Sequence, residues 1–275
     1  MIEVKKWFLI LLTVVLFNFS LVTNASAAST VERKDLGKYF EGFTTGTFVM
    51  YDESKDQYIV FNKKQSEKRL SPCSTFKIYN SLAGLETGVL DQEDVYTLFK
   101  WNGTKYPFPT WDHDQTLASA TRDSVVWYFQ ELASRIGPER MQAFLKKIKY
   151  GNRDISGGLT TFWLGSSLKI SAHEQVDLLH KLYSGKLPIS PQNVEIVKRN
   201  ITLLKNDNLR LMGKTGSELK NDKLVTGWFV GCVEKQGKRY FFATNIEAAD
   251  GINGPKAKEI SKSILKELQI LENNS

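Results

Sequence analysis

Three patterns of hydrophobic and polar positions follow one another along the chain. Residues 46–62 hold two β-rich runs on either side of the polar residues 52–56, which predicts a hairpin. In the middle of the chain, apolar residues recur every three or four positions, which is the spacing of one helix face. From residue 210 onward the pattern changes to a period of two, which is the spacing of strands. The chain therefore begins with strands, continues with helices and returns to strands.

Glycine, proline and capping residues divide these segments into separate elements. Ser171 and Glu174 form a predicted capping box, Gly185 ends that helix, and Pro138 opens another. One predicted helix begins at Ser74, and the others cover residues 116–137, 137–148, 171–185, 191–204 and 255–271. The predicted C-terminal strands cover residues 210–216, 224–235 and 239–247, and the predicted loops cover 104–115 and 150–158.

This order of elements favours the α+β fold class over an alternating α/β fold, because strands and helices are segregated along the chain. We expect the N-terminal and C-terminal strands to join one antiparallel sheet. The middle helices are expected to form a second, mostly helical lobe, with a cleft between the lobe and the sheet.

The first 27 residues have a different character from the rest. Lys5 and Lys6 precede an apolar run at 7–17, and small residues follow at 25–27, which is the order of a secretory signal peptide. We expect cleavage after Ala27, which leaves one domain at 28–275; an uncleaved N-terminal anchor is the alternative. No later segment approaches the roughly 18 unbroken apolar residues of a membrane span. The mature chain is therefore expected to be secreted or extracytoplasmic, whether extracellular, in the cell envelope or periplasmic.

Composition and charge narrow the classes of partner. Of the 275 residues, 41% are hydrophobic, which is enough for a large core. The net charge of +7 is spread over many segments and is not gathered into basic arms. A nucleic-acid partner is therefore disfavoured. Nothing in the sequence indicates an oligomeric state.

The cysteines and histidines are few. With three histidines, two cysteines and no CxxC or HExxH spacing, the sequence predicts no metal site. Cys73 and Cys232 either pair in an oxidising compartment or remain two separate buried thiols, and we favour the second. A thiol mechanism at Cys73 is disfavoured, because a cysteine is often a small buried hydrophobe.

Ser74 and Lys77 carry the first candidate chemistry. In a helix that begins at Ser74, the two side chains lie one turn apart on the same face, so that the amine can touch the hydroxyl. The alternative is structural, with Ser74 as N-cap and Lys77 as a solvated first-turn residue. However, a cation at a helix N-terminus opposes the macrodipole. The apolar flanks Phe76, Ile78 and Tyr79 are more typical of a partly buried, neutral lysine.

Residue chemistry favours Lys77 as a catalytic base. A serine hydroxyl needs a base to become a nucleophile at neutral pH, and none of the three histidines lies in a recognisable triad motif. The reference pKa of a lysine is ~10.4. Burial among apolar side chains such as its neighbour Phe76 would lower the pKa of Lys77, because an apolar site disfavours the charged amine.

Four short polar clusters fall at predicted element edges, at 74–77, 124–126, 150–152 and 214–216. Their order resembles that of the serine β-lactamases and penicillin-binding proteins. More narrowly, it resembles the class D, oxacillinase-type β-lactamases, which carry S-x-x-K, S-x-V, Y-G-N and K-T-G. The family's tryptophan after Y-G-N matches Trp163, which Leu164 follows. The resemblance runs from residue 45 to the C-terminal helix.

The resemblance implies a fold and a set of catalytic roles. The implied fold is an antiparallel sheet flanked by terminal helices, together with a mostly helical lobe. Ser74 is the implied nucleophile, and Ser124 relays a proton to the leaving nitrogen. In the family, the amine equivalent to Lys77 captures carbon dioxide and becomes N6-carboxylysine, and the indole N–H of Trp163 would hold that group.

The resemblance also implies binding groups for the substrate. Lys214 and Thr215, with Gly216, are expected to bind the carboxylate of a β-lactam. The backbone N–H groups of Ser74 and Ser217 are expected to form the oxyanion hole.

Further site residues follow from the same resemblance. Val125 lies in the S-x-V motif and is expected to contact the substrate. The family commonly has an arginine near the start of the last helix, where this chain has none, and Lys256 or Lys258 would replace it as a point charge. Tyr150 and Asn152 are interpreted as structural residues of the cleft wall.

The implied activity is hydrolysis of β-lactam antibiotics, with penicillins as the first substrate class and cephalosporins as a further one. Such an enzyme is a hydrolase of cyclic amides and needs no cofactor beyond the carbon dioxide or bicarbonate that carboxylates Lys77. The alternatives are a penicillin-binding sensor and a cell-wall transpeptidase or carboxypeptidase, which are acylated but turn over slowly. The sensors carry several membrane helices and a zinc protease ahead of this domain, and no HExxH occurs here.

Overall fold

A computed structural model describes residues 28–92 and 98–272, so the predicted signal peptide at 1–27 lies outside the described residues. The strands are β1 (Ser29–Glu32), β2 (Thr45–Asp52), β3 (Gln57–Phe61), β4 (Thr202–Lys205), β5 (Leu209–Lys220), β6 (Lys223–Lys235) and β7 (Lys238–Glu247). The α-helices are α1 (Lys63–Glu67), α2 (Lys77–Glu86), α3 (Leu117–Arg122), α4 (Val126–Ile136), α5 (Pro138–Lys147), α6 (Ala172–Tyr183), α7 (Pro191–Asn200) and α8 (Gly254–Glu267). The 3-10 helices are η1 (Lys34–Phe40), η2 (Cys73–Phe76) and η4 (Pro109–Trp111).

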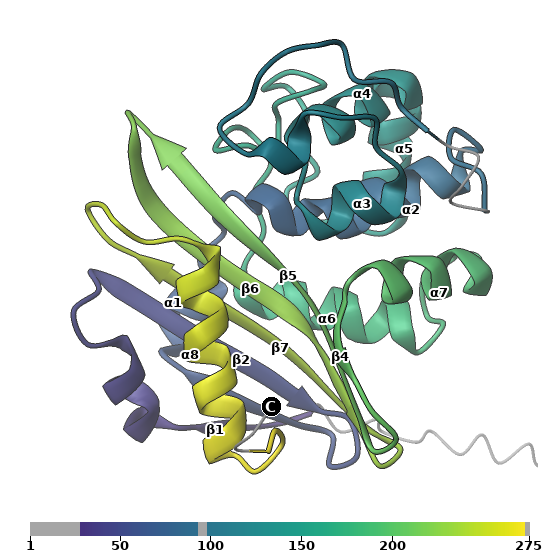
Figure 1. Cartoon of the computed structure of the whole chain (residues 1–275). Coiled ribbons are helices and arrows are strands. Elements are labelled where there is room, and N and C mark those ends of the chain that lie inside the picture. The colour runs from purple at the N-terminus through teal and green to yellow at the C-terminus, as the bar shows by residue number, and fades with distance from the viewer. Residues whose placement is uncertain (1–27, 93–97, 273–275) are drawn as a thin grey trace, which may run out of the picture.

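The strands form a seven-stranded sheet in the order β1-β3-β2-β7-β6-β5-β4 (Figure 1). The pairing of β2 with β7 is antiparallel and places the N-terminal hairpin beside the C-terminal strands. This confirms the expectation of one sheet built from both ends of the chain. The sheet is not wholly antiparallel, because β1 pairs with β3 in parallel at one edge.

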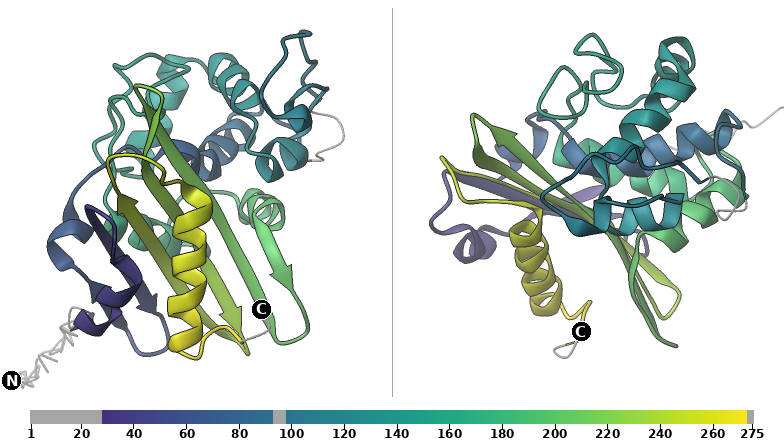
Figure 2. Two further views of the ribbon diagram at one scale, coloured as in Figure 1. Left: turned by 60° about the vertical axis from the view of Figure 1, so that its left-hand side comes forward. Right: turned by 45° about the horizontal axis from the view of Figure 1, so that its top comes forward.

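Two hydrophobic cores lie on opposite faces of the sheet. Successive side chains of a strand point to opposite faces, and β6 shows the result: Trp228 and Val230 belong to the core under the helical lobe, whereas Phe229 belongs to the other core. Ile260 and Ile264 of α8 cover that second face. Figure 2 shows α8 on one side of the sheet and the helical lobe on the other. The α+β fold predicted from the sequence is therefore confirmed.

Local signals place several helices where they were predicted. The Ser171 side chain accepts from the backbone N–H of Glu174, and the Glu174 carboxylate accepts from that of Ser171, so the capping box is formed. Gly185 follows α6 with a φ of 69°, a left-handed conformation that costs glycine little. Pro138 begins α5. Proline suits this position because the backbone N–H of the first helical residue has no partner within the helix, so its absence costs no hydrogen bond.

Three helix boundaries differ from the predictions. The helix expected at 191–204 ends at Asn200, because Thr202–Lys205 pairs with β5 as edge strand β4. The helix expected at 116–137 is divided into α3 and α4, since Ser124 has a φ of 55°. The helix expected to begin at Ser74 begins instead as the 3-10 turn η2, and Ser74 is not its N-cap.

Three short N-terminal elements, β1, η1 and α1, were not predicted, because each is too short to show a hydrophobic period. Within the described part of the chain, no helix is both long and apolar enough to cross a membrane.

Candidate active site

Ser74 lies in η2, directly before α2, at the junction of the sheet and the helical lobe. Its side chain is partly exposed and lines a cleft of about 790 Å³. Strand β5 reaches this turn through Gly216: a Cβ atom there would come within 2.9 Å of the Pro72 carbonyl oxygen. Glycine is therefore needed at this position for the K-T-G strand to approach the turn that carries Ser74.

Lys77 is fully buried at the start of α2. Its Nζ donates to the backbone oxygen of Ser124 at 2.6 Å and to the Ser124 Oγ at 2.9 Å. Its Nζ also lies 5.3 Å from the ring centroid of Phe129. Burial holds the pKa of Lys77 well below its ordinary value of 10.5, and the nearby charge of Lys214 lowers it further. Burial therefore favours the neutral form of the amine, and the two Ser124 oxygens accept its two hydrogen bonds.

Ser124 connects the two lysines of the site. It sits between α3 and α4 with a φ of 55°, a conformation that few residues other than glycine adopt. Ser124 Oγ accepts from Lys77 Nζ and from Lys214 Nζ, the latter at 3.0 Å. With both lone pairs of the oxygen used, its own O–H is free to donate elsewhere.

Lys214 is buried on β5, with 6% of its surface exposed. Besides Ser124 Oγ, its Nζ donates to the Thr215 carbonyl oxygen at 3.2 Å. Burial lowers the pKa of Lys214 to about 8, and the charge of Lys258 contributes to this shift. Lys214 therefore loses its positive charge as the pH rises through about 8, whereas an exposed lysine keeps its charge there.

Trp163 is fully buried and packs against Phe76, with their ring centroids 5.8 Å apart. Within the described structure its Nε1 has no hydrogen-bond partner. The backbone around it is fixed by Ser71, whose Oγ donates to the Trp163 carbonyl oxygen and accepts from Gly165 N, each at 2.9 Å. The indole N–H is therefore held in place in a core next to the Lys77 turn, and it lacks an acceptor.

The cleft brings most of the predicted residues together. Ser74, Ser124 and Leu164 line it beside the predicted binding residues Thr215, Gly216 and Ser217. Lys77 and Lys214 do not line the cleft and reach it through Ser124. Val125 is fully buried in the core, and its neighbour Val126 lines the cleft instead.

The structure does not bring Lys256 to the cleft. Its Nζ pairs with Glu259 at 3.1 Å on the exposed side of α8, and 52% of its side chain is exposed. Lys258 lines a separate small cavity that also contacts Lys214 and Thr215. Neither lysine lines the cleft where the family commonly places an arginine.

Tyr150 and Asn152 have the contacts of structural residues. Tyr150 is fully buried, with its ring 5.3 Å from that of Phe76. Asn152 holds the loop that leads to and from Trp163: its Nδ2 donates to the Ser167 carbonyl oxygen at 2.8 Å, and its Oδ1 accepts from Lys169 N at 2.8 Å.

Asn152→Ala should therefore lower the free energy of unfolding by about 1–3 kcal/mol, because backbone groups of the Trp163 loop lose their partners. Chemical denaturation of the variant and the wild type measures this difference. An unchanged unfolding midpoint and slope would show that Asn152 does not hold the loop.

The two cysteines are free and buried. The expectation of two separate thiols is thus confirmed, and the alternative of a disulfide is wrong. Burial raises the pKa of the Cys73 thiol to about 12, so the nucleophilic thiolate is absent at neutral pH. Cys73 is therefore not a second nucleophile beside Ser74.

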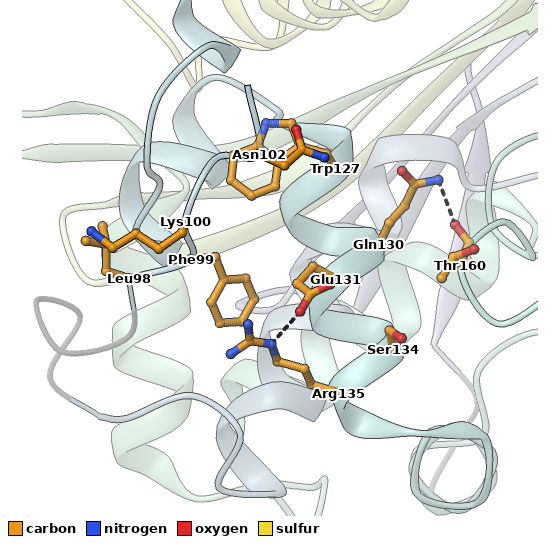
Figure 3. A pocket seen from close by; sticks show the side chains of 10 residues that line it. All are labelled: Leu98, Phe99, Lys100, Asn102, Trp127, Gln130, Glu131, Ser134, Arg135 and Thr160. Atoms are coloured by element: carbon orange, nitrogen blue, oxygen red, sulfur yellow. Dashed lines mark hydrogen bonds and ion pairs between the residues drawn. The ribbon is translucent and has the colours of Figure 1, made fainter. Parts of the chain in front are cut away.

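A second hollow of about 490 Å³ lies away from the predicted site residues (Figure 3). Arg135 lines this hollow, and its guanidinium lies 4.1 Å from the Phe99 ring centroid and 2.7 Å from the Glu131 carboxylate. The Gln130 amide donates to the Thr160 carbonyl oxygen. These groups satisfy one another, and among the described residues that line the hollow no nucleophile is paired with a base. Its lining consists of Leu98, Phe99, Lys100, Asn102, Trp127, Gln130, Glu131, Ser134, Arg135 and Thr160.

The cleft also has an apolar rim that was not predicted from the sequence, formed by Phe108, Trp111, Val126, Leu219 and Leu224. Phe108 and Leu219 are 56% and 63% exposed, which is unusual for large apolar side chains. The two large apolar rings in the polar loop at 104–115 were a signal that could have located one side of this rim.

Comparison with known proteins agrees with this geometry. Residues 45–266 match the penicillin binding protein transpeptidase domain family. The protein named probable beta-lactamase YbxI of Bacillus subtilis strain 168 is 40% identical over 273 residues, which cover 97% of this chain and 99% of that protein. A class D beta-lactamase structure from Bacillus subtilis is 41% identical, has a TM-score of 0.80, and is matched over 86% of this chain and 97% of that one.

A penicillin receptor is similar as well. The C-terminal domain of the Bacillus licheniformis BlaR penicillin-receptor is 38% identical with a TM-score of 0.83, over 88% of this chain and 98% of that domain. The regulatory protein BlaR1 from the same organism is 39% identical, but the match covers only 39% of its length. The site combines a buried lysine one turn after an accessible serine with a K-T-G strand beside them, and the chain is similar to a β-lactamase over its full length. The chain therefore belongs to the penicillin binding protein transpeptidase family and, within it, to the class D β-lactamases.

Proposed function

We propose that the chain hydrolyses β-lactam antibiotics, with penicillins as the first substrate class and cephalosporins as a further one, through an acyl-enzyme on Ser74. The observation that carries this proposal is the state of Lys77. Its amine is fully buried and hydrogen-bonded to Ser124, burial lowers its pKa and favours the neutral form, and Ser74 lies one turn before it. A neutral amine in a dry site can accept a proton or react with carbon dioxide, whereas a solvated ammonium can do neither.

Lys77 is proposed to carry the carboxylate of N6-carboxylysine. The fit is supported by the Trp163 Nε1–H, which is buried and has no acceptor among the described residues. Leaving a buried donor unpaired costs about 1–3 kcal/mol, so an anionic oxygen beside it would be stabilising. The added group supplies an oxygen base in an apolar pocket.

Acylation is proposed to proceed in the following steps. Lys77 takes the proton of Ser74, whose Oγ forms a bond to the carbonyl carbon of the lactam. The backbone N–H groups of Ser74 and Ser217 hold the oxyanion. The C–N bond of the ring breaks as the O–H of Ser124 delivers its proton to the nitrogen, and Ser124 takes in return, through its hydrogen bond with Lys77, the proton that came from Ser74. Water, activated at Lys77, then attacks the ester and releases Ser74.

Lys214 and Thr215 are proposed to recognise the substrate carboxylate. Thr215 lines the cleft, and Lys214 is the cation behind it. Because an ammonium in a buried site interacts strongly with an anion, the charge of Lys214 should matter more than its hydrogen bonds. Lys256, which is paired with Glu259, does not take part in this account.

We expect kcat/KM for a penicillin to fall as the pH rises through about 8, the pKa of Lys214. Below this pH the amine is charged and attracts the carboxylate, and above it the attraction is lost. Lys214→Arg should remove this fall, because an arginine stays charged. An identical basic limb in both proteins would show that another group titrates.

Trp163→Phe should acylate at a normal rate and deacylate about 10²-fold more slowly, as expected when a general base loses its positioning. Stopped-flow measurements separate the burst from the steady state. Trp228→Phe is the matched control, because it removes the N–H of another fully buried indole, which donates to the Ser71 carbonyl oxygen. Unchanged deacylation in Trp163→Phe would remove this residue from the mechanism.

Turnover of a chromogenic cephalosporin tests the proposed function. Sustained hydrolysis that rises with bicarbonate is expected for a class D enzyme. One stoichiometric burst followed by a stable adduct would favour a sensor, which the similarity to the BlaR receptor domain makes the second candidate, or a transpeptidase.

We also propose that the chain acts outside the cytoplasm, with residues 1–27 removed as a signal peptide after Ala27. The order of charged, apolar and small residues in this segment supports the proposal. N-terminal sequencing of the protein recovered from the medium or the cell envelope would locate the cleavage site.

A further inference from the structure

A small polar cavity lies behind the K-T-G strand. Its volume is about 170 Å³, and it shares Thr215 with the substrate cleft. It is bounded by the end of α3, the turn from α7 to β4, the middle of β5 and the first turns of α8. The lining residues are Thr121, Arg122, Asn200, Ile201, Thr202, Leu203, Gly213, Lys214, Thr215, Phe229 and Lys258.

The charges around this cavity are not balanced. Arg122 pairs with Asp123 at 2.8 Å, and is thereby compensated. Lys214 donates to two uncharged oxygens, and Lys258 has no ion pair or hydrogen bond with any residue that the structure describes. No described carboxylate lines the cavity. Two lysines whose positive charges interact with each other therefore line the same cavity, and no described carboxylate compensates them there.

Two uncharged groups at the cavity also lack partners. The Thr121 side chain is 4% exposed, and its Oγ1 has no hydrogen-bond partner in the described part of the chain. The same holds for Asn200 Nδ2, which is buried as well. Both atoms carry hydrogens that can be donated. Water would satisfy these donors but would leave the two positive charges uncompensated.

We propose that this cavity binds a small inorganic oxyanion of the phosphate or sulfate class, held between Lys214 and Lys258 with Thr121 and Asn200 as hydrogen-bond donors. A cavity of roughly 150 Å³ holds a benzene molecule, so a tetrahedral ion of five heavy atoms fits. The cavity shares Thr215 with the cleft, and Lys214 is also proposed to bind the substrate, but binding of the ion does not depend on whether the chain turns over a β-lactam.

Calorimetric titration of the purified protein with inorganic phosphate, at constant ionic strength, tests the proposal. We expect saturable binding with one ion per chain. Lys258→Met should weaken it at least tenfold, because one of the two cations is lost. Lys256→Met is the matched control: it removes a lysine two residues away on the same helix, which is paired with Glu259 and does not line the cavity. Equal effects of the two substitutions, or no saturable binding, would overturn the proposal.

A second variant and a second measurement keep the test independent of folding. Thr121→Val preserves the shape of the side chain, removes only the hydroxyl, and should also weaken phosphate binding. A crystal soaked in selenate should show anomalous density between Lys214 and Lys258. Density in the substrate cleft alone, or none in the cavity, would contradict the assignment.

Discussion

Ser74→Ala is expected to abolish formation of a penicillin adduct and to reduce turnover by roughly 10⁴-fold or more, the order of loss found when an activated serine nucleophile is removed. The physical reason is that neither neighbouring Cys73 nor Ser124 can replace this hydroxyl. Ser124 Oγ accepts from two lysines, and the pKa of the Cys73 thiol is raised to about 12 by burial. Intact mass spectrometry after mixing with penicillin measures the adduct directly.

Ser81→Ala is the matched control for this substitution. Ser81 is a buried serine on α2 whose Oγ donates to the Lys77 carbonyl oxygen at 2.7 Å, and it does not line the cleft. Loss of the Ser81 hydroxyl should lower the free energy of unfolding but leave acylation of Ser74 intact. A stoichiometric adduct on the Ser74→Ala protein would place the nucleophile elsewhere.

Lys77→Met is expected to reduce turnover by about 10² to 10⁴-fold, the range of a general base. Methionine keeps the buried volume near that of lysine, whereas Lys77→Ala would open a cavity and lower the free energy of unfolding by about 2–5 kcal/mol. The two variants together separate loss of the base from loss of packing. Steady-state rates and thermal unfolding are the measurements, and a normal rate in the Met variant would remove Lys77 from catalysis.

Much of the fold was predictable because the hydrophobic spacing is regular. The β2–β3 hairpin, the strands β5 to β7 and the helices α5, α6 and α8 lie where the pattern places them. The errors occur where tertiary contacts override a local pattern. Thr202–Lys205 joins the sheet edge although its spacing continues that of α7, and Ser124 breaks a helical run because two lysines hold it.

The candidate site was predictable as a set of residue types but not as a geometry. The order of motifs indicated Ser74, Lys77, Ser124 and the K-T-G strand. Sequence spacing could not show that Lys214 lies behind the cleft, or that Val126 faces it in place of Val125. The unpartnered Nε1 of Trp163 depends on packing between distant segments, which no local pattern encodes.

The state of the Lys77 side chain is the central claim, and one measurement addresses it most directly. Carbon-13 NMR of the protein in ¹³C-labelled bicarbonate should show a carbamate resonance in the wild type, none in Lys77→Met, and a weaker one in Trp163→Phe. A wild-type protein that turns over a β-lactam but shows no carbamate resonance would contradict the account.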